Sequence, residues 1–395
     1  MKYWWGYLTA AIFAAFSWAL MQMGQKYNQL VDMVYPYVTR SIQGFLAQWS
    51  GTVDVCVWQV AVVLFGVVVL AGLVLLIIFK GNIVRYIGWV LAVVSIVFFL
   101  HTGVYGLNYY AGAIEDDLRL EVTDYTLSNL EQATTYYRDQ ANALAQQMKR
   151  DANGDLVYSD FDTLAAQAGD GFDSLVLNRS FSIFAGDTSP VKKLGWSDMY
   201  SSMGITGFTC FLTGEAAVNP QTPVQGLPFT ICHEMAHRMC VAQEDEANFS
   251  AYLACVANSS KEFQYSAYFM AYRYCYNALH SSDPAIAARV NKSCSPELLH
   301  DMTAYSQFFS SKRDQTATQV ADTVNDTYLK VSGDGDGLAS YGKVCDLLVN
   351  WYLSEFAPKE EQGVPLFDPY DETQVDLTGL PHAVIPETEA TEPAA

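Results

Sequence analysis

Charged side chains are scarce in this sequence. They make up 16% of its 395 residues, whereas hydrophobic residues make up 51%; ordinary soluble domains contain about 25% charged residues. This shortage argues against an enzyme that is dissolved in water along its whole length. Aromatic residues reach 14%, a core-forming composition that excludes a largely disordered chain.

Basic residues are the scarcer of the two charged kinds. Lys and Arg number 22 against 42 Asp and Glu, for a net charge of −20. Residues 1–107 carry five basic and two acidic residues, a net charge of +3, so the remainder carries −23. An acidic domain of this kind repels nucleic acid and anionic lipid head groups, which argues against nucleic acid as a partner.

The apolar residues are concentrated before Tyr110. Three stretches, about residues 3–25, 55–79 and 87–106, are long enough to cross roughly 30 Å of hydrocarbon at about 1.5 Å per residue. The second stretch contains no polar residue after Gln59. The sequence therefore predicts three N-terminal transmembrane helices and the lipid bilayer as a partner.

The positions of basic residues near the spans predict the orientation, because positively charged short loops stay on the cytoplasmic side. Lys2 precedes the first span, and Lys80 and Arg85 fill the short loop between the second and third. Lys26 and Arg40 oppose this assignment but lie in a longer loop. We therefore expect a cytoplasmic N-terminus and an extracytoplasmic domain after the third span. A cleaved signal peptide is the alternative for the first span.

We expect a membrane domain at 1–110, a soluble domain at 111–356 and a disordered tail, acidic and containing Pro, at 357–395. The soluble domain has the pattern of a mostly helical α+β fold with a small sheet. Residues 204–218 are typical of a strand with its turn, and 118–149 of one long amphipathic helix. Further helices are expected near 228–241, 245–258, 262–280, 296–309, 314–330 and 338–356.

Seven of the eight cysteines lie outside the predicted spans. An extracytoplasmic location permits disulfides, but seven is an odd number and sequence alone does not determine the pairing. Buried thiols are an equally good interpretation of several of them.

One short motif carries specific chemistry: His233-Glu-Met-Ala-His237. Residues four apart on a helix share a face, so both imidazoles can bind one tetrahedral zinc. Glu234 lies one position further around the helix, where its carboxylate can act as the general base of a metallopeptidase rather than as a ligand. The motif predicts a Zn²⁺ cofactor.

The third zinc ligand is expected in the acidic segment that follows the motif. On one straight helix, Glu246 would lie about 13.5 Å beyond His237 on the opposite face, and Glu244 about 10.5 Å away. A carboxylate can bind the metal only if the helix breaks between residues 239 and 243. We predict this break and Glu246 as the third ligand, with Glu244 as the second candidate. The thiol of Cys240 is too far from His233 to complete the site.

Several segments resemble the domain-of-unknown-function 3810 family, a family of bacterial membrane-anchored, zincin-like proteins. The resemblance rests on the three spans and on these segments: Leu107–Tyr110, Phe211–Asn219, Leu227–His237, Glu244–Leu253, Val324–Lys330 and Ser340–Gly342. It implies a zincin-like fold and a metallopeptidase activity in which the Glu-Ala-Asn-Phe helix supplies the glutamate ligand. Relatives often carry glycine where this chain has Cys240.

Peptide recognition in zincins uses a strand edge beside the active helix, for which residues 207–213 are the candidate. Phe211 and Glu215 in this region, and Tyr341 in a later helix, are candidates for substrate contact or for stabilisation of the oxyanion. Structural roles are an equally good interpretation of these residues.

The sequence thus predicts an integral membrane zinc metallopeptidase of the bacterial cell membrane that hydrolyses a peptide or protein substrate with Glu234 as general base. The alternative is a non-catalytic, zinc-containing envelope protein that binds peptides or partners. A closed site with four protein ligands would favour this alternative, whereas three ligands and a water favour catalysis.

Overall fold

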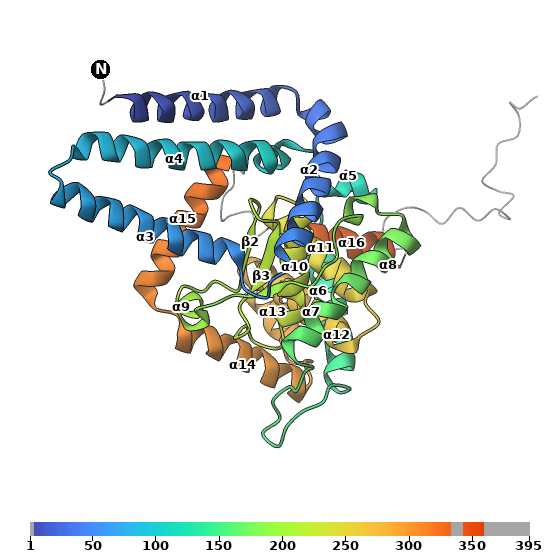
Figure 1. Cartoon of the computed structure of the whole chain (residues 1–395). Coiled ribbons are helices and arrows are strands. Elements are labelled where there is room, and N and C mark those ends of the chain that lie inside the picture. The colour runs from blue at the N-terminus through green and yellow to red at the C-terminus, as the bar shows by residue number, and fades with distance from the viewer. Residues whose placement is uncertain (1–3, 333–342, 359–395) are drawn as a thin grey trace, which may run out of the picture. The chain divides into compact units, whose positions relative to one another are not determined.

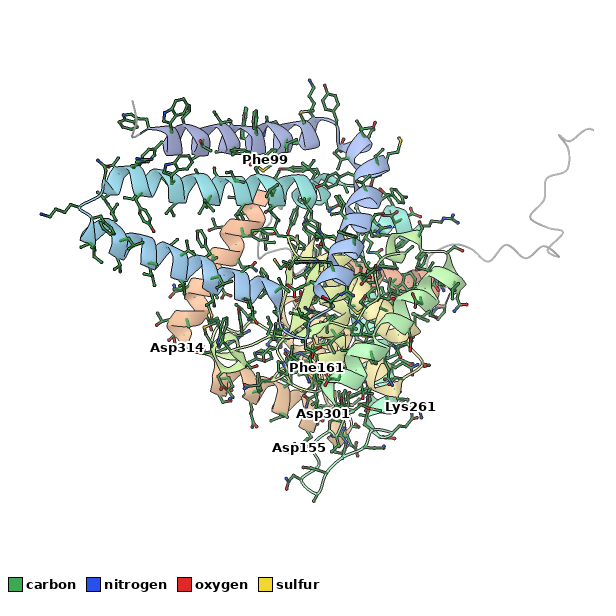
Figure 2. The ribbon with its side chains drawn as sticks, viewed as in Figure 1. Phe99, Asp155, Phe161, Lys261, Asp301 and Asp314 are labelled. Atoms are coloured by element: carbon green, nitrogen blue, oxygen red, sulfur yellow. The ribbon has the colours of Figure 1, made fainter. Side chains whose placement is uncertain are left out.

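Three long apolar helices form much of the N-terminal part of the protein. A computed structural model describes residues 4–332 and 343–358. In it, α1 (Trp5–Lys26), α3 (Val57–Ile78) and α4 (Ile83–Val104) are 22 residues each and can cross a membrane by length and composition. The three predicted spans are confirmed as candidate membrane helices, with boundaries that differ by a few residues. Figure 1 shows α1 and α4 side by side, and Phe99 packs on Phe13 with ring centroids 5.4 Å apart (Figure 2).

A fourth N-terminal helix, α2 (Asn28–Ser50), joins α1 to α3 where the sequence suggested only a loop. The short 3₁₀ helix η1 (Gly106–Tyr110) follows α4. Tyr35 on α2 donates hydrogen bonds to the carbonyls of Thr102 and Gly103, at the end of α4. The helix α2 therefore runs across the end of α4 at which the chain continues into the helical domain (Figure 1).

The rest of the described chain is mostly helical. The expected single helix over 118–149 is wrong: Arg119 ends α5 in the left-handed conformation, and Thr126 starts α6 as its N-cap. The helices of this part are α5 (Ile114–Leu118), α6 (Leu127–Ala145), α7 (Phe161–Gln167), α8 (Gly169–Arg179), η2 (Ser182–Phe184), α9 (Ser197–Ser202), α10 (Leu227–Arg238), α11 (Glu244–Ala257), α12 (Lys261–Ser282), α13 (Pro284–Asn291), α14 (Pro296–Lys312), α15 (Gln315–Ser332) and α16 (Val344–Glu355).

A small sheet lies against the helices in the order β1-β3-β2. The strands are β1 (Lys192–Lys193), β2 (Gly207–Cys210) and β3 (Glu215–Val218). The strands β2 and β3 form the antiparallel hairpin expected within 204–218, while β1 pairs parallel with β3. Gly214 makes the turn with φ of +66°, which glycine adopts without strain. The sheet contacts α10, and β2 is one of its edge strands.

The buried core includes one charged group that is fully paired. Asp301 on α14 has no exposed surface, and it forms a bidentate ion pair with Arg150 at 2.7 and 2.9 Å. It also accepts a hydrogen bond from the hydroxyl of Tyr265. Because a buried carboxylate is costly unless it is paired, these contacts fix α14 to the hairpin near residue 150 and to α12.

The described residues up to Glu355 form one compact unit. The expected boundary at residue 110 falls between η1 and α5, inside this unit. The predicted disordered tail lies almost entirely outside the described residues. All eight cysteines are free thiols, seven of them buried and Cys210 partly exposed.

Candidate metal centre

The helix α10 carries the two histidines of the motif on one face. It starts with Pro228 in its first turn, where the missing N–H of proline costs nothing. The Nε2 atoms of His233 and His237 lie 3.1 Å apart. The Nδ1 atom of His237 lies 2.8 Å from the carbonyl oxygen of Val241. Because a carbonyl only accepts, Nδ1 carries a proton, which leaves Nε2 as the ring atom that can bind a metal.

The helix break predicted after the motif is confirmed. The last residue of α10 is Arg238, and Cys240 adopts the left-handed conformation with φ of +72°. The N–H of Cys240 donates to the carbonyl of His237 at 2.9 Å, and that of Val241 to Ala236 at 3.1 Å. This pair of bonds is the Schellman arrangement, which normally places glycine at the left-handed position. The chain then reverses into α11.

The reversal brings Glu244 beside the histidines. Its Oε2 atom lies 3.4 Å from Nε2 of His233 and 3.7 Å from Nε2 of His237. These three side chains form the one cluster of metal-ligating type found among the described residues. Glu244 is therefore the carboxylate that the structure places beside the imidazole pair.

The structure does not bring Glu246, the residue predicted as third ligand, to the histidines. Its Oε1 atom accepts a hydrogen bond of 3.0 Å from the N–H of Ile114. Because α11 begins at Glu244, a residue two positions later points about 200° around the helix, away from the histidines. Burial raises the pKa of Glu246 well above its ordinary value, and nearby Asp245 raises it further.

The donor set fits a zinc ion. Two ligand atoms at about 2.0–2.1 Å from a tetrahedral zinc lie about 3.4 Å apart, and the three separations here are 3.1, 3.4 and 3.7 Å. The buried Oε2 atom of Glu244 accepts no hydrogen bond from the described residues. A buried carboxylate oxygen without a donor is costly unless a cation satisfies it.

Protons would compete with a metal ion for the imidazole of His237 and the carboxylate of Glu244. Burial lowers the pKa of His237, but its interactions with Glu244 and the charge of Glu234 together outweigh burial and raise the pKa to about 9. Burial raises the pKa of Glu244, but its interactions with His237 and His233 together outweigh burial and hold the pKa well below its ordinary value. Without a metal, a proton on the imidazole thus balances the carboxylate, and a divalent cation would displace that proton.

Glu234 is held by the edge strand β2. Its Oε2 atom accepts a hydrogen bond of 2.7 Å from the hydroxyl of Thr209. A side chain at position 207 would collide with Oε1 of Glu234, so Gly207 leaves room for the carboxylate. Burial raises the pKa of Glu234, and the two histidines partly oppose this. Thr209 and Gly207 were not singled out from sequence, where only their place in the expected strand was visible.

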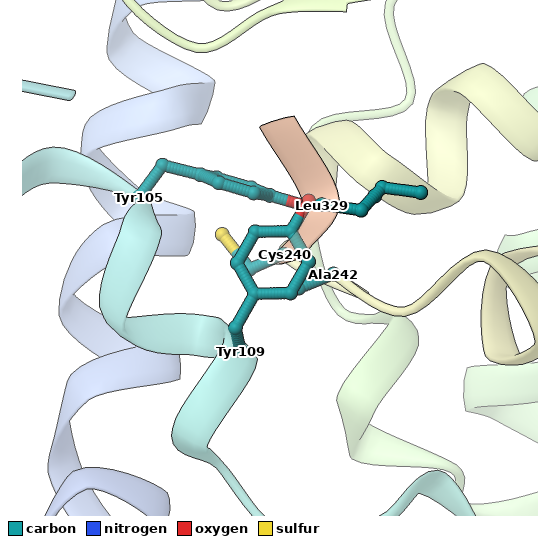
Figure 3. Packing of buried hydrophobic residues seen from close by; sticks show 5 residues of the cluster. All are labelled: Tyr105, Tyr109, Cys240, Ala242 and Leu329. Carbon is teal, nitrogen blue, oxygen red and sulfur yellow. The ribbon is translucent and has the colours of Figure 1, made fainter. Parts of the chain in front are cut away.

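The loop after α10 packs against the segment that leaves α4. Cys240 and Ala242 from this loop form a buried cluster with Tyr105 and Tyr109 of the η1 region and with Leu329 of α15 (Figure 3). The hydroxyl of Tyr105 also donates to the carbonyl of Val241 at 3.3 Å. The turn that brings Glu244 to the histidines is therefore supported from the membrane-helix side.

The residues predicted to contact the substrate have other partners in the structure. Phe211 stacks on Tyr105 with ring centroids 3.4 Å apart, and its carbonyl accepts from Gln43, so it serves packing. Glu215 is corrected to a structural residue. Its buried carboxylate forms an ion pair of 2.7 Å with Lys192. It also accepts hydrogen bonds from the backbone N–H groups of the first two residues of α3. Tyr341 lies outside the described residues.

A family model described as "Protein of unknown function (DUF3810)" matches residues 31–349. The chain belongs to this family. The DUF3810 match starts within α2 and ends within α16, so it covers the helix α10, its reversal and Glu244. No curated protein matches the chain. No solved structure matches it either.

Proposed function

We propose that the protein is a membrane-anchored zinc metallopeptidase of zincin-like fold. The observation that carries this proposal is the approach of Glu244 Oε2 to the imidazole pair, at 3.4 and 3.7 Å. His233, His237 and Glu244 would hold the zinc. Three protein ligands leave one tetrahedral position for water, which is typical of catalytic rather than structural zinc sites.

Bound zinc would supply Lewis acidity for the peptide carbonyl and for a water molecule. Glu234 is the general base: it takes a proton from the attacking water and passes it to the leaving amine. The hydroxyl of Thr209 donates a hydrogen bond to Oε2 of Glu234, so Oε1 is the oxygen left for proton transfer. A raised pKa brings this carboxylate closer to the operating pH, which favours both steps.

The strand β2 is the natural partner for an extended substrate. It lies at an edge of the sheet and contacts α10. An edge strand offers backbone N–H and C=O groups to a peptide that adds as a further strand. The peptide would then run past Glu234, whose carboxylate is hydrogen-bonded to β2.

We propose that the N-terminus is cytoplasmic and the helical domain extracytoplasmic. Lys80 follows α3 and Arg85 lies in the first turn of α4, at the end of these spans opposite the domain, which supports this orientation. The envelope of a bacterial cell is then the site of action.

The test uses the full chain, purified in detergent and loaded with zinc. Cleavage of a peptide library is compared between the wild type and Glu234→Gln, and zinc content is measured in both. The proposal predicts that the variant keeps its zinc and loses cleavage by at least about a hundredfold. If the wild type binds zinc and cleaves nothing, the alternative of a non-catalytic zinc protein holds. Full activity of the variant would remove Glu234 from its role.

A further inference from the structure

The exposed face of α2 is strongly apolar. Val34, Val38, Ile42, Phe45 and Trp49 are all exposed. Their spacing of three or four residues places them in one row along the helix. We call these five residues the apolar stripe. Soluble proteins rarely leave a row of large apolar side chains in water, so the stripe requires an occupant.

The opposite face of α2 is fixed to the helical domain. Arg40 is 7% exposed, and it donates to the carbonyls of Met239 and Ser182, both at 3.1 Å. Gln43 donates to the carbonyl of Phe211 at 2.9 Å. Arg40 and Asp32 are the charged residues of α2, and Asp32 accepts from the N–H of Gly112. No charged residue therefore interrupts the apolar stripe.

The ends of α2 are tied to the ends of the membrane helices. The helix α1 ends at Lys26 and α3 begins at Val57. Consecutive membrane helices run in opposite directions, so these two ends lie at the same membrane surface. The third crossing, α4, also ends at this surface, where Tyr35 of α2 bonds to it. Figure 1 shows α2 running crosswise to α1 and α4 at this level.

We infer that α2 lies in the plane of the membrane surface, with the apolar stripe among the lipids. The bilayer is the occupant because both ends of α2 are fixed at its surface. Trp49, which is exposed at the end of the apolar stripe, suits the head-group region, where Trp is enriched. Amphipathic helices at this depth bury the apolar face and keep the other face on the protein or in water.

This position has a consequence for the metal centre. Arg40 holds the carbonyl of Met239, and Tyr105 holds that of Val241. Both carbonyls belong to the loop that brings Glu244 to the histidines. The metal centre is therefore tied to the membrane surface from two sides. If the proposed function is right, its substrates are polypeptides anchored in the same membrane and cleaved close to the surface.

The position of the apolar stripe is tested in full-length protein in lipid vesicles. A polarity-sensitive fluorophore is attached to Ile42→Cys, and quenching by lipids that carry a nitroxide on the upper acyl chain is measured. Val68→Cys on α3 is the lipid-exposed reference, and Leu299→Cys on α14 is the matched domain control; Val68 and Leu299 are 67% and 39% exposed. Labelling of the unsubstituted chain corrects for the partly exposed Cys210.

We expect the fluorophore at position 42 to be quenched several-fold more than that at 299 and to approach the value at 68. Equal quenching at 42 and 299 would overturn the inference, because the apolar stripe would then face water. A label at 42 that is shielded from both lipid and aqueous quenchers would also overturn it, in favour of a second copy of the chain as occupant.

The substrate class is tested separately with one peptide that the protein cleaves, offered free and tethered to the vesicle surface. We expect at least tenfold faster cleavage of the tethered form at equal bulk concentration. Equal rates would reject the substrate class. If neither form is cleaved while position 42 is quenched, the proposed function fails and the membrane position of α2 stands.

Discussion

The hydroxyl of Thr209 on β2 donates a hydrogen bond of 2.7 Å to the carboxylate of Glu234 on α10. Both groups are buried, and the same hydroxyl also contacts the backbone carbonyl of Glu234 at 3.0 Å. The edge strand thereby fixes the position and the charge of the proposed base.

Thr209→Val should weaken catalysis without removing the metal. The substitution removes a bond to a charged group, worth about 1.5–3 kcal/mol, so kcat/KM should fall by about 10- to 100-fold. Loss of the donor also raises the pKa of Glu234, which should move the acid limb of the pH–rate profile upward. Thr209→Ser, which keeps the hydroxyl, is the control and should retain most activity. An unchanged profile in Thr209→Val would contradict this role.

Zinc affinity should increase with pH up to about 9. In the metal-free protein the pKa of His237 is raised to about 9, so the imidazole is protonated at pH 7 and zinc must displace that proton. The apparent affinity should therefore rise about tenfold per pH unit from 7 to 9 and level off above. Competition with a chromophoric chelator measures it. An affinity independent of pH over this range would show that no such proton is displaced.

Cys240 should tolerate glycine but not a β-branched residue. Its φ of +72° costs an ordinary side chain about 1–2 kcal/mol, and glycine avoids that cost while losing the packing of the thiol on Tyr105 and Tyr109. Cys240→Gly should thus change the free energy of unfolding by less than about 1 kcal/mol. Cys240→Val should destabilise by about 2 kcal/mol or more. Thermal unfolding of the full chain compares them, and equal stability of the two variants would refute the strain argument.

Arg40→Met should weaken the attachment of α2 to the loop of residues 239–243, which follows α10. The guanidinium is the cation that binds the carbonyl of Met239, and hydrogen bonds from charged groups are worth about 1.5–3 kcal/mol. We expect weaker zinc binding, by about tenfold, together with a lower unfolding temperature. The control is Gln48→Met on the same helix, which removes a surface contact with Asp187. Equal zinc affinity in Arg40→Met and wild type would show that α2 does not influence the metal centre.

Composition and spacing were enough to predict the membrane helices and the break in the motif helix. The break followed from distance alone, since neither carboxylate could reach the histidines along a straight helix. The choice between Glu244 and Glu246 depended on where α11 starts, and this start is set by the left-handed turn at Cys240, which the spacing of the ligands does not encode. The resemblance to DUF3810 did not correct the choice.

The helix α2 was missed although its signal is in the sequence. Apolar residues recur at 34, 38, 42, 45 and 49, the period of an amphipathic helix. The segment contains no apolar run long enough to span a membrane, so it resembles a loop between two spans. The partners of Glu215 could not be predicted for a different reason: its contacts with Lys192 and with the start of α3 exist only in the folded chain.

We propose that Glu244, and not Glu246, completes the metal centre. The most direct measurement is the zinc content of the purified full chain for wild type, Glu244→Gln and Glu246→Gln. The two substitutions lie two positions apart on the same helix. Glutamine at 246 can still accept a hydrogen bond from the N–H of Ile114. We expect about one zinc per chain in the wild type and in Glu246→Gln, and a large loss in Glu244→Gln. Zinc retained by Glu244→Gln and lost by Glu246→Gln would contradict it.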